Sequence, residues 1–77
     1  MKELVELIVK RLVKNVDAVE VEEMHNNNDV TIVVKLDAED MGRVIGKNGR
    51  TAMAIRTVVK TCAKKSNVRV DVKFEKK

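Results

Sequence analysis

The chain has few of the residues that build disulfides, base-stacking surfaces and rigid turns. Its 77 residues include one cysteine, no proline, three glycines and a single aromatic residue, Phe74. A lone cysteine excludes an internal disulfide and is typical of proteins from a reducing compartment. One aromatic residue also excludes a surface on which successive bases stack, a contact worth ~1–3 kcal/mol per base.

Long hydrophobic runs are absent as well. Glu3 and Glu6 interrupt the first apolar residues before they reach the length of a secretory signal. No stretch approaches the ~20 apolar residues of a membrane span. The sequence therefore predicts a soluble, cytoplasmic protein with no membrane partner. Its length predicts one domain over residues 1–77, with a thin core, because a chain of this size buries only ~60% of its unfolded surface.

Acidic residues are missing from one long segment. Between Asp40 and Asp71 there is no Asp or Glu, whereas eight basic residues give a local charge of +8. The rest of the chain carries −4, so the net charge is +4. Such clustering is typical of a protein that binds a polyanion. A solvated basic face on a helix is an equally good interpretation of the charges alone.

Hydrophobic periodicity predicts six elements in the order α-β-β-α-α-β. Spacing of three to four residues indicates helices, and strict alternation indicates strands. The helices are expected over 3–14, 38–45 and 50–65, and the strands over 18–24, 29–36 and 67–74. A turn at residues 25–29, HNNND, should join the first two strands. Because each strand is apolar on one face only, we expect an α+β fold in which three helices cover one face of a three-stranded sheet.

The middle helix carries sequence signals at both ends. Asp37 stands at the expected N-cap, and Asp40 follows three residues later in an acidic variant of the capping box. Gly46 should end this helix, because glycine adopts the conformations in which helices stop.

Two of the three glycines frame a charged tetrapeptide, Gly46-Lys47-Asn48-Gly49, between the two later helices. Glycine permits a positive φ and the close approach of another backbone segment. The amides of Asn48, Gly49 and Arg50 should lie at a helix N-terminus, where free N–H groups and the helix dipole favour an anion. A G-x-x-G spacing alone is weak evidence, but its place at a helix junction inside the acid-free segment predicts a phosphate-binding loop.

Residues 44–55, VIGKNGRTAMAI, resemble the VIGxxGxxIxxI signature of KH domains, in which this loop clamps the backbone of about four nucleotides. The element order resembles the bacterial type II variant of the fold. The likeness spans nearly the whole chain, which is similar to small stand-alone bacterial KH proteins of the KhpA type. One departure is Ala52, because the signature usually has Ile or Val there.

The resemblance implies a protein that grips single-stranded RNA, acting as a post-transcriptional regulator or RNA chaperone. It implies self-association into a dimer and a larger KH-containing protein partner. Gly46 and Gly49 would shape the loop, and Lys47, Asn48 and Arg50 would face phosphates. The implied site also includes the apolar positions of the signature, Val44, Ile45 and Ile55, which would fit the core equally well. It is completed by two flanking cations, Arg43 and Arg56, which would equally well be solvated side chains.

Other chemistries fit the sequence poorly, and we expect neither an enzyme nor a cofactor. Gly42 and Gly46 are one residue too close together for the two glycines of a Walker A loop. Cys62 falls on the apolar arc of its helix, and His25 falls in the expected turn, so the two do not suggest a nucleophile and base. One Cys and one His do not fill a zinc site. The main alternative to RNA binding is a protein-interaction or dimerisation module with a basic face.

Overall fold

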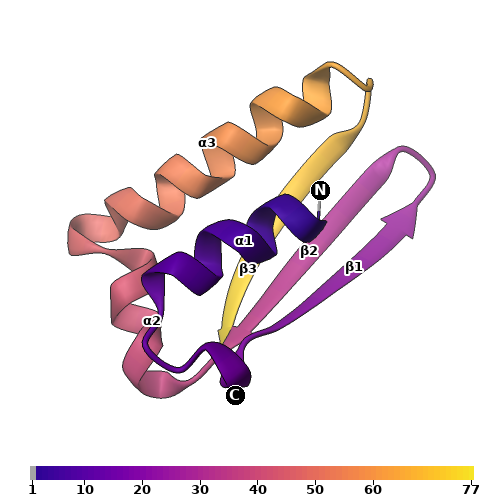
Figure 1. Ribbon diagram of the computed structural model, residues 1–77. Coiled ribbons are helices and arrows are strands. Elements are labelled where there is room, and N and C mark those ends of the chain that lie inside the picture. Colours follow the sequence, from indigo (N-terminus) through magenta and orange to yellow (C-terminus); the bar gives the residue numbers. More distant parts are fainter. Residues whose placement is uncertain (1) are drawn as a thin grey trace.

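Helices and strands follow one another in the order that the sequence predicts. A computed structural model describes residues 2–77. Its main elements are α1 (Lys2–Leu12), β1 (Glu20–Asn26), β2 (Asp29–Leu36), α2 (Ala38–Ile45), α3 (Arg50–Lys64) and β3 (Arg69–Lys76) (Figure 1). Two short 3-10 turns, η1 (Val16–Ala18) and η2 (Lys47–Gly49), were not expected. The predicted order α-β-β-α-α-β is confirmed.

The sheet is mixed, with β2 in the centre. β1 runs antiparallel to β2, and β3 runs parallel to β2. In this register Val34 of β2 lies between Val21 and Phe74 of the outer strands. Parallel neighbours require a crossover connection, which α2 and α3 supply. This arrangement is that of a type II KH-like fold.

The core lies between one face of the sheet and the helices. Alternate residues of β2 and β3 point toward the helices, and each helix contributes buried valines to meet them. Val5 of α1, Val44 of α2 and Val59 of α3 are each 0% exposed. Figure 1 shows the helices gathered over the same face of the sheet, as expected for a two-layer α+β fold. The path from β2 through α2 and α3 to β3 therefore crosses over this one face of the sheet.

The predicted capping box is wrong. The Asp37 side chain makes no capping hydrogen bond. The carboxylate of Asp40, which is only 2% exposed, instead accepts hydrogen bonds from the backbone N–H groups of Lys14 and Asn15, each at 3.0 Å. These N–H groups follow the end of α1, and a buried carboxylate is stabilised by such donors. Asp40 therefore fastens α2 to the end of α1.

The turn between β1 and β2 is shorter than expected. Both strands extend to the pair Asn26 and Asp29, which leaves a two-residue turn at Asn27 and Asn28. Asn27 has a φ of 58°, which lets the chain reverse within these two residues. His25 therefore lies in β1 opposite Val30, not in the turn.

Candidate functional site

The segment between α2 and α3 is shaped by its two glycines. Gly46 has φ 76° and ψ 176°, a combination that is essentially confined to glycine. A Cβ at this position would lie 2.7 Å from the Cβ of Thr51, so glycine is also required by the close approach of α3. Gly49 has φ 73° and ψ 12°, in the left-handed region, with open space around it. The expected positive φ is therefore present at both glycines.

The two residues between the glycines are presented to solvent. Lys47 and Asn48 are exposed, and Asn48 has a φ of 57°. Asparagine tolerates this left-handed conformation better than most residues. The loop coils as a 3-10 turn, so its side chains point outward while Gly46 passes close to α3.

The loop itself uses some of the backbone N–H groups that the sequence predicts to bind an anion. The Gly49 N–H donates to the Gly46 carbonyl at 3.2 Å, and the Arg50 N–H donates to the Lys47 carbonyl. These bonds arise because the loop coils tightly before α3 begins. Of the three amides that the sequence predicts to face an anion, those of Gly49 and Arg50 are therefore used within the loop.

The apolar residues of the signature lie mostly beneath the loop. Val44 is 0% exposed and Ile55 is 4% exposed, so both pack in the core. Ala52 is buried beside them, whereas Ile45 is half-buried. Ile45 is thus the apolar side chain of this group that reaches the surface.

Arg56 reaches from α3 to the edge of the sheet. Its Nε donates a hydrogen bond to the Val72 carbonyl at 3.1 Å, and its guanidinium carbon lies 5.5 Å from the centre of the Phe74 ring. Arginine has five N–H donors, so this bond leaves four for another partner. The side chain is held beside β3 by these contacts, which the sequence did not reveal.

Arg43 lies beside the buried carboxylate of Asp40, with its Nε 3.5 Å from Oδ1 and its side chain 55% exposed. The backbone hydrogen bond from Lys14 is the main cause of a lowered pKa of Asp40. Burial opposes this, while the Asn15 hydrogen bond and the charges of Arg43 and Lys14 reinforce it. Asp40 is therefore an anion at neutral pH, and it takes up part of the Arg43 charge.

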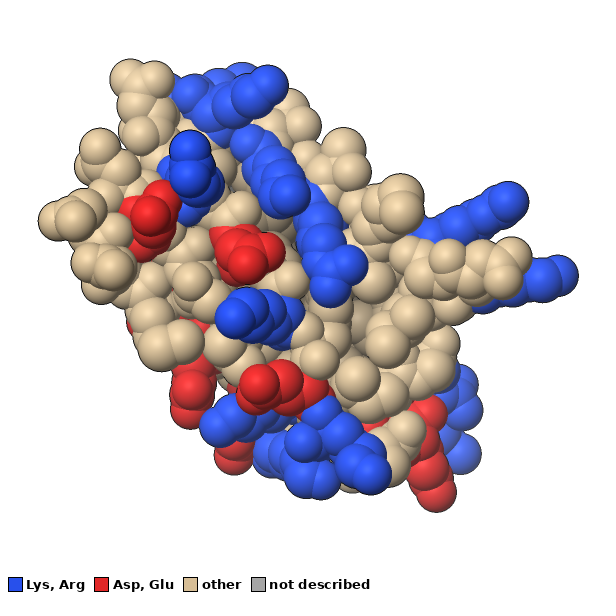
Figure 2. Space-filling view, turned by 180° about the vertical axis from the view of Figure 1, so that it is seen from behind, with Lys and Arg blue, Asp and Glu red and all other residues tan. Residues whose placement is uncertain are grey.

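Several charges of the sheet's open face are paired, whereas the basic residues of the loop and of α3 form no salt bridge within residues 2–77. Lys35 lies 3.5 Å from Glu22, and Lys77 lies 3.2 Å from Glu20. In the part of the chain that the structure describes, no salt bridge involves the basic residues of the loop or of α3: Lys47, Arg50, Arg56, Lys60 and Lys64. Figure 2 shows basic side chains in a diagonal row on one side of the molecule and mixed charges below it.

A hollow of about 650 Å³ lies where the last turns of α3 face the start of β3. The lining residues are Lys60, Lys64, Asn67, Val68, Arg69, Val70 and Asp71. Sequence reasoning recorded the cations of this region but missed the hollow, because it depends on the spacing between helix and strand. The acid-free segment was the one signal that pointed to it.

Two features are absent from the described residues, a cluster of metal ligands and a membrane-spanning helix. Among residues 2–77, no group of three or more His, Cys, Asp or Glu side chains is arranged to hold a metal ion. His25 of β1 contacts Glu23, with 3.3 Å between Nε2 and Oε1, and Cys62 lies in α3. None of the helices described here has the length and hydropathy that a membrane crossing requires.

Comparison with known proteins gives a consistent match along the chain. The family model described as "KhpA/KhpB, KH domain" matches residues 2–74. The RNA-binding protein KhpA of Caldanaerobacter subterraneus is 55% identical over 74 residues, which cover 96% of this chain and 99% of that protein. The KhpA of Clostridium perfringens is 51% identical with the same coverage. That of Aquifex aeolicus is 41% identical over 70 residues, covering 91% of this chain and 89% of its own length.

Proposed function

Because the chain belongs to the KhpA/KhpB family of KH domains, we propose that it binds single-stranded RNA through the G-K-N-G loop and the adjoining side of α3 and β3. Similar proteins from several bacteria are named RNA-binding proteins. The observation that carries the proposal is the exposed loop, with the cations Lys47 and Arg50, at the N-terminus of α3 in the acid-free segment.

The loop is suited to a phosphate group. The Lys47 ammonium and Arg50 guanidinium supply positive charge, and the exposed Asn48 side chain offers an amide donor. The N-terminus of α3 adds its dipole, which favours an anion at this position. Gly46 and Gly49 act indirectly, because they set the backbone path that exposes these groups.

The bases would lie between Ile45 and the free edge of β3. The Val72 carbonyl faces this edge, since Arg56 reaches it from outside the sheet. Backbone groups alternate in direction along a strand. Val70 and Phe74 therefore also turn their N–H and C=O groups to the edge, where they are placed to bond the Watson–Crick edges of unstacked bases. With one aromatic residue in the chain, base contacts are aliphatic and polar.

A single KH domain over residues 1–77 would hold RNA weakly in this way. A second copy, or a larger KH-containing protein, would raise the affinity through avidity. Self-association and such a partner stay predictions, as does the role of a post-transcriptional regulator or RNA chaperone. The alternative of a protein-interaction module rests on apolar exposure, notably that of Met53, which is 64% exposed.

The test is a titration with short single-stranded RNA and with duplex RNA of the same sequence at several salt concentrations. We expect a preference for the unpaired strand, because the site must reach splayed bases. The log of the affinity should fall with the log of the salt concentration at a slope of about −2 to −3, from ~3–4 phosphates at ~0.7 each. A slope near zero, or equal binding of the duplex, contradicts the proposal, and absence of RNA binding favours the interaction module.

A further inference from the structure

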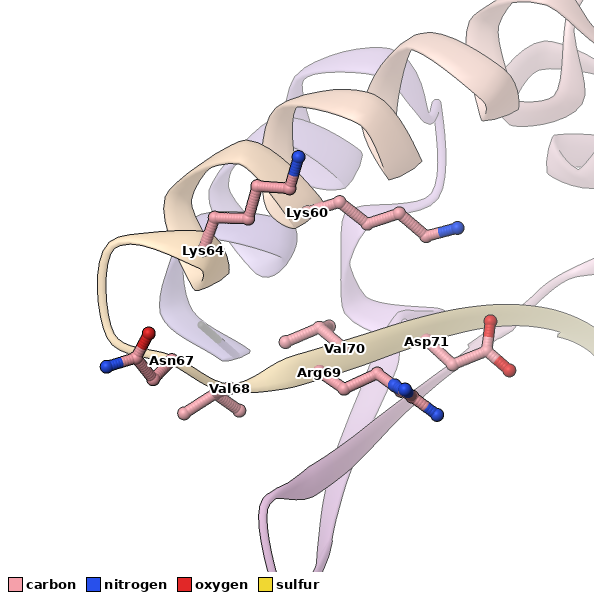
Figure 3. Close-up of a pocket in the computed structure, with 7 residues that line it drawn as sticks. All are labelled: Lys60, Lys64, Asn67, Val68, Arg69, Val70 and Asp71. Carbon is pink, nitrogen blue, oxygen red and sulfur yellow. The ribbon is translucent and has the colours of Figure 1, made fainter.

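The hollow between α3 and β3 combines an apolar floor with cations on both sides. Figure 3 shows Lys60 and Lys64 on the helix, with Val70 on the strand opposite and Val68 just before it, and Lys60 extends along the space between helix and strand. Its volume of about 650 Å³ falls within the ~300–1,000 Å³ range of small-ligand sites. Both valines pack against the core, so the floor of the hollow is rigid.

The hollow lies at the opposite end of α3 from the G-K-N-G loop. A helix of 15 residues is ~22 Å long at 1.5 Å per residue. About four stacked nucleotides, the number that the loop is expected to clamp, span only ~14 Å at ~3.4 Å each. Arg56, Lys60 and Lys64 follow one another at four-residue spacing along the helical face between the two places. A strand that starts at the loop therefore meets cations all the way to the hollow.

We propose that this hollow is a second subsite for the same RNA strand, which holds a nucleotide beyond those clamped at the loop; this rests on the proposed function. The ammonium groups of Lys60 and Lys64 would contact its phosphates, since neither forms a salt bridge among residues 2–77. Val68 and Val70 would pack beneath its base or ribose. A basic groove that tracks the backbone is the usual device of single-strand binding.

The remaining polar residues of the hollow fit a nucleotide better than a simple anion. Arg69 is loosely paired with Asp29, with 3.9 Å between Nε and Oδ1. Asp71 also lines the hollow, and its carboxylate would repel a phosphate placed beside it. Carboxylates accept hydrogen bonds from base amino groups and ribose hydroxyls. We therefore place the phosphates toward α3 and the base or ribose toward β3.

The test compares single-stranded RNA of about four and about ten nucleotides, the shorter matching the expected reach of the loop. Wild type should bind the longer strand more tightly. In Lys60→Gln combined with Lys64→Gln, affinity for the short strand should stay unchanged, and affinity for the long strand should fall to that of the short one. The salt slope with the long strand should become shallower by about 1.4, from two lysines at ~0.7 each.

Lys10→Gln combined with Lys14→Gln is the matched control, because it removes the same charge from α1 and the segment after it. This control variant should still bind the longer RNA strand more tightly than the shorter one. If wild type binds the short strand but gains nothing from the longer one, or if the α3 variant keeps the gain, the second subsite is overturned while RNA binding at the loop stands. If wild type binds neither strand, the proposed function itself fails.

A protein segment is the other occupant that a basic hollow at a sheet edge admits. Backbone amide signals of Asn67 and Val68, which line the hollow and precede β3, distinguish the two when followed by NMR. We expect them to shift with the long RNA strand and not with the short one. Shifts of these signals with a poly-glutamate peptide, and none with long RNA, would assign the hollow to a protein partner and overturn the proposal.

Discussion

The G-K-N-G loop and the β1–β2 turn have similar backbone features but opposite surroundings. Each holds an exposed asparagine in the left-handed region, Asn48 at φ 57° and Asn27 at φ 58°. The β1–β2 turn continues from β1, which carries Glu20, Glu22 and Glu23. The loop lies at the N-terminus of α3 within the acid-free segment. A left-handed asparagine therefore does not make an anion site, and the charge and the helix terminus around it decide.

The two turns also differ in what holds them. The β1–β2 turn is set by the pairing of Asn26 with Asp29. The loop depends on Gly46, which passes close to Thr51, and on α2, which Asp40 fastens to the end of α1. We expect substitutions at these supports to change the loop while the β1–β2 turn stays as it is.

The largest expected effect is loss of RNA binding in Lys47→Asp combined with Asn48→Asp. The change reverses the charge at the loop and removes phosphate contacts whose charge-assisted hydrogen bonds are worth ~1.5–3 kcal/mol each. Two such contacts correspond to a loss of more than about 100-fold in affinity. Both side chains are exposed, so the free energy of unfolding should change by less than ~0.5 kcal/mol. A thermal melt and an RNA titration on one preparation measure both quantities.

Asn27→Asp combined with Asn28→Asp provides a control in the β1–β2 turn, where it changes the charge by about −2 instead of −3. It should leave RNA affinity within a small factor of wild type, because this turn lies beside acidic β1. Equal losses in the two double variants would show that total charge, not the loop, governs binding. Retained binding in the loop variant would move the contact to the basic face of α3.

Gly46→Ala should destabilise the protein more than Gly49→Ala does. At Gly46, backbone strain of ~1–3 kcal/mol adds to the contact with Thr51. At Gly49 the left-handed conformation costs ~1–2 kcal/mol, and no atom lies within 4 Å of the new Cβ. Urea unfolding of the two variants gives the difference directly. Equal losses of stability would mean that the contact with Thr51 adds nothing to the cost of a Cβ at position 46.

Acidification should weaken the support of the loop through Asp40. Its pKa in the folded protein is lowered, chiefly by the Lys14 N–H hydrogen bond, so folding favours the ionised form. This contribution is complete above the usual pKa of ~3.9 and is lost as the pH falls through the lower folded value. Melting temperatures measured from neutral to acidic pH should therefore fall less steeply in Asp40→Asn, which starts lower at neutral pH. Parallel curves for the two proteins would contradict this role of Asp40.

The smallest expected effect is a gain of stability in Gly42→Ala. Gly42 lies inside α2 without a positive φ, and no atom lies within 4 Å of a new Cβ. Alanine should therefore raise the free energy of unfolding by about 0.5–1 kcal/mol through its helix propensity. Comparison with Gly46→Ala then shows whether glycine is required at Gly46 in particular, because Gly42 lies in a helix where glycine is not required. A destabilised variant would show that the space beside Gly42 is required.

Local sequence signals were enough for the elements and the position of the loop. The predicted range Ala38–Ile45 matches α2, because the signals of its start and of its end at Gly46 lie in the adjoining residues. The acid-free segment also indicated the basic side of α3. These features depend on neighbours within a few positions along the chain.

The contacts that support the site were not predictable in the same way. Asp40 was misread as part of a cap because its donor Asn15 lies 25 residues away. The bond from Arg56 to the Val72 carbonyl spans 16 residues and requires the position of β3. The use of the Gly49 N–H within the loop follows from its 3-10 coil, which the composition of the loop does not reveal.

The most direct test of where RNA lies is an NMR titration with short single-stranded RNA, in which every backbone amide is followed. We predict that the amides of Lys47 and Asn48 shift most, because both residues are exposed between the two glycines, where the phosphate is expected to bind. Amides along the β3 edge should shift less, and those of Asn27 and Asn28 should stay in place. Large shifts in the β1–β2 turn with unchanged signals in the G-K-N-G loop would contradict the assignment of the loop as the RNA site.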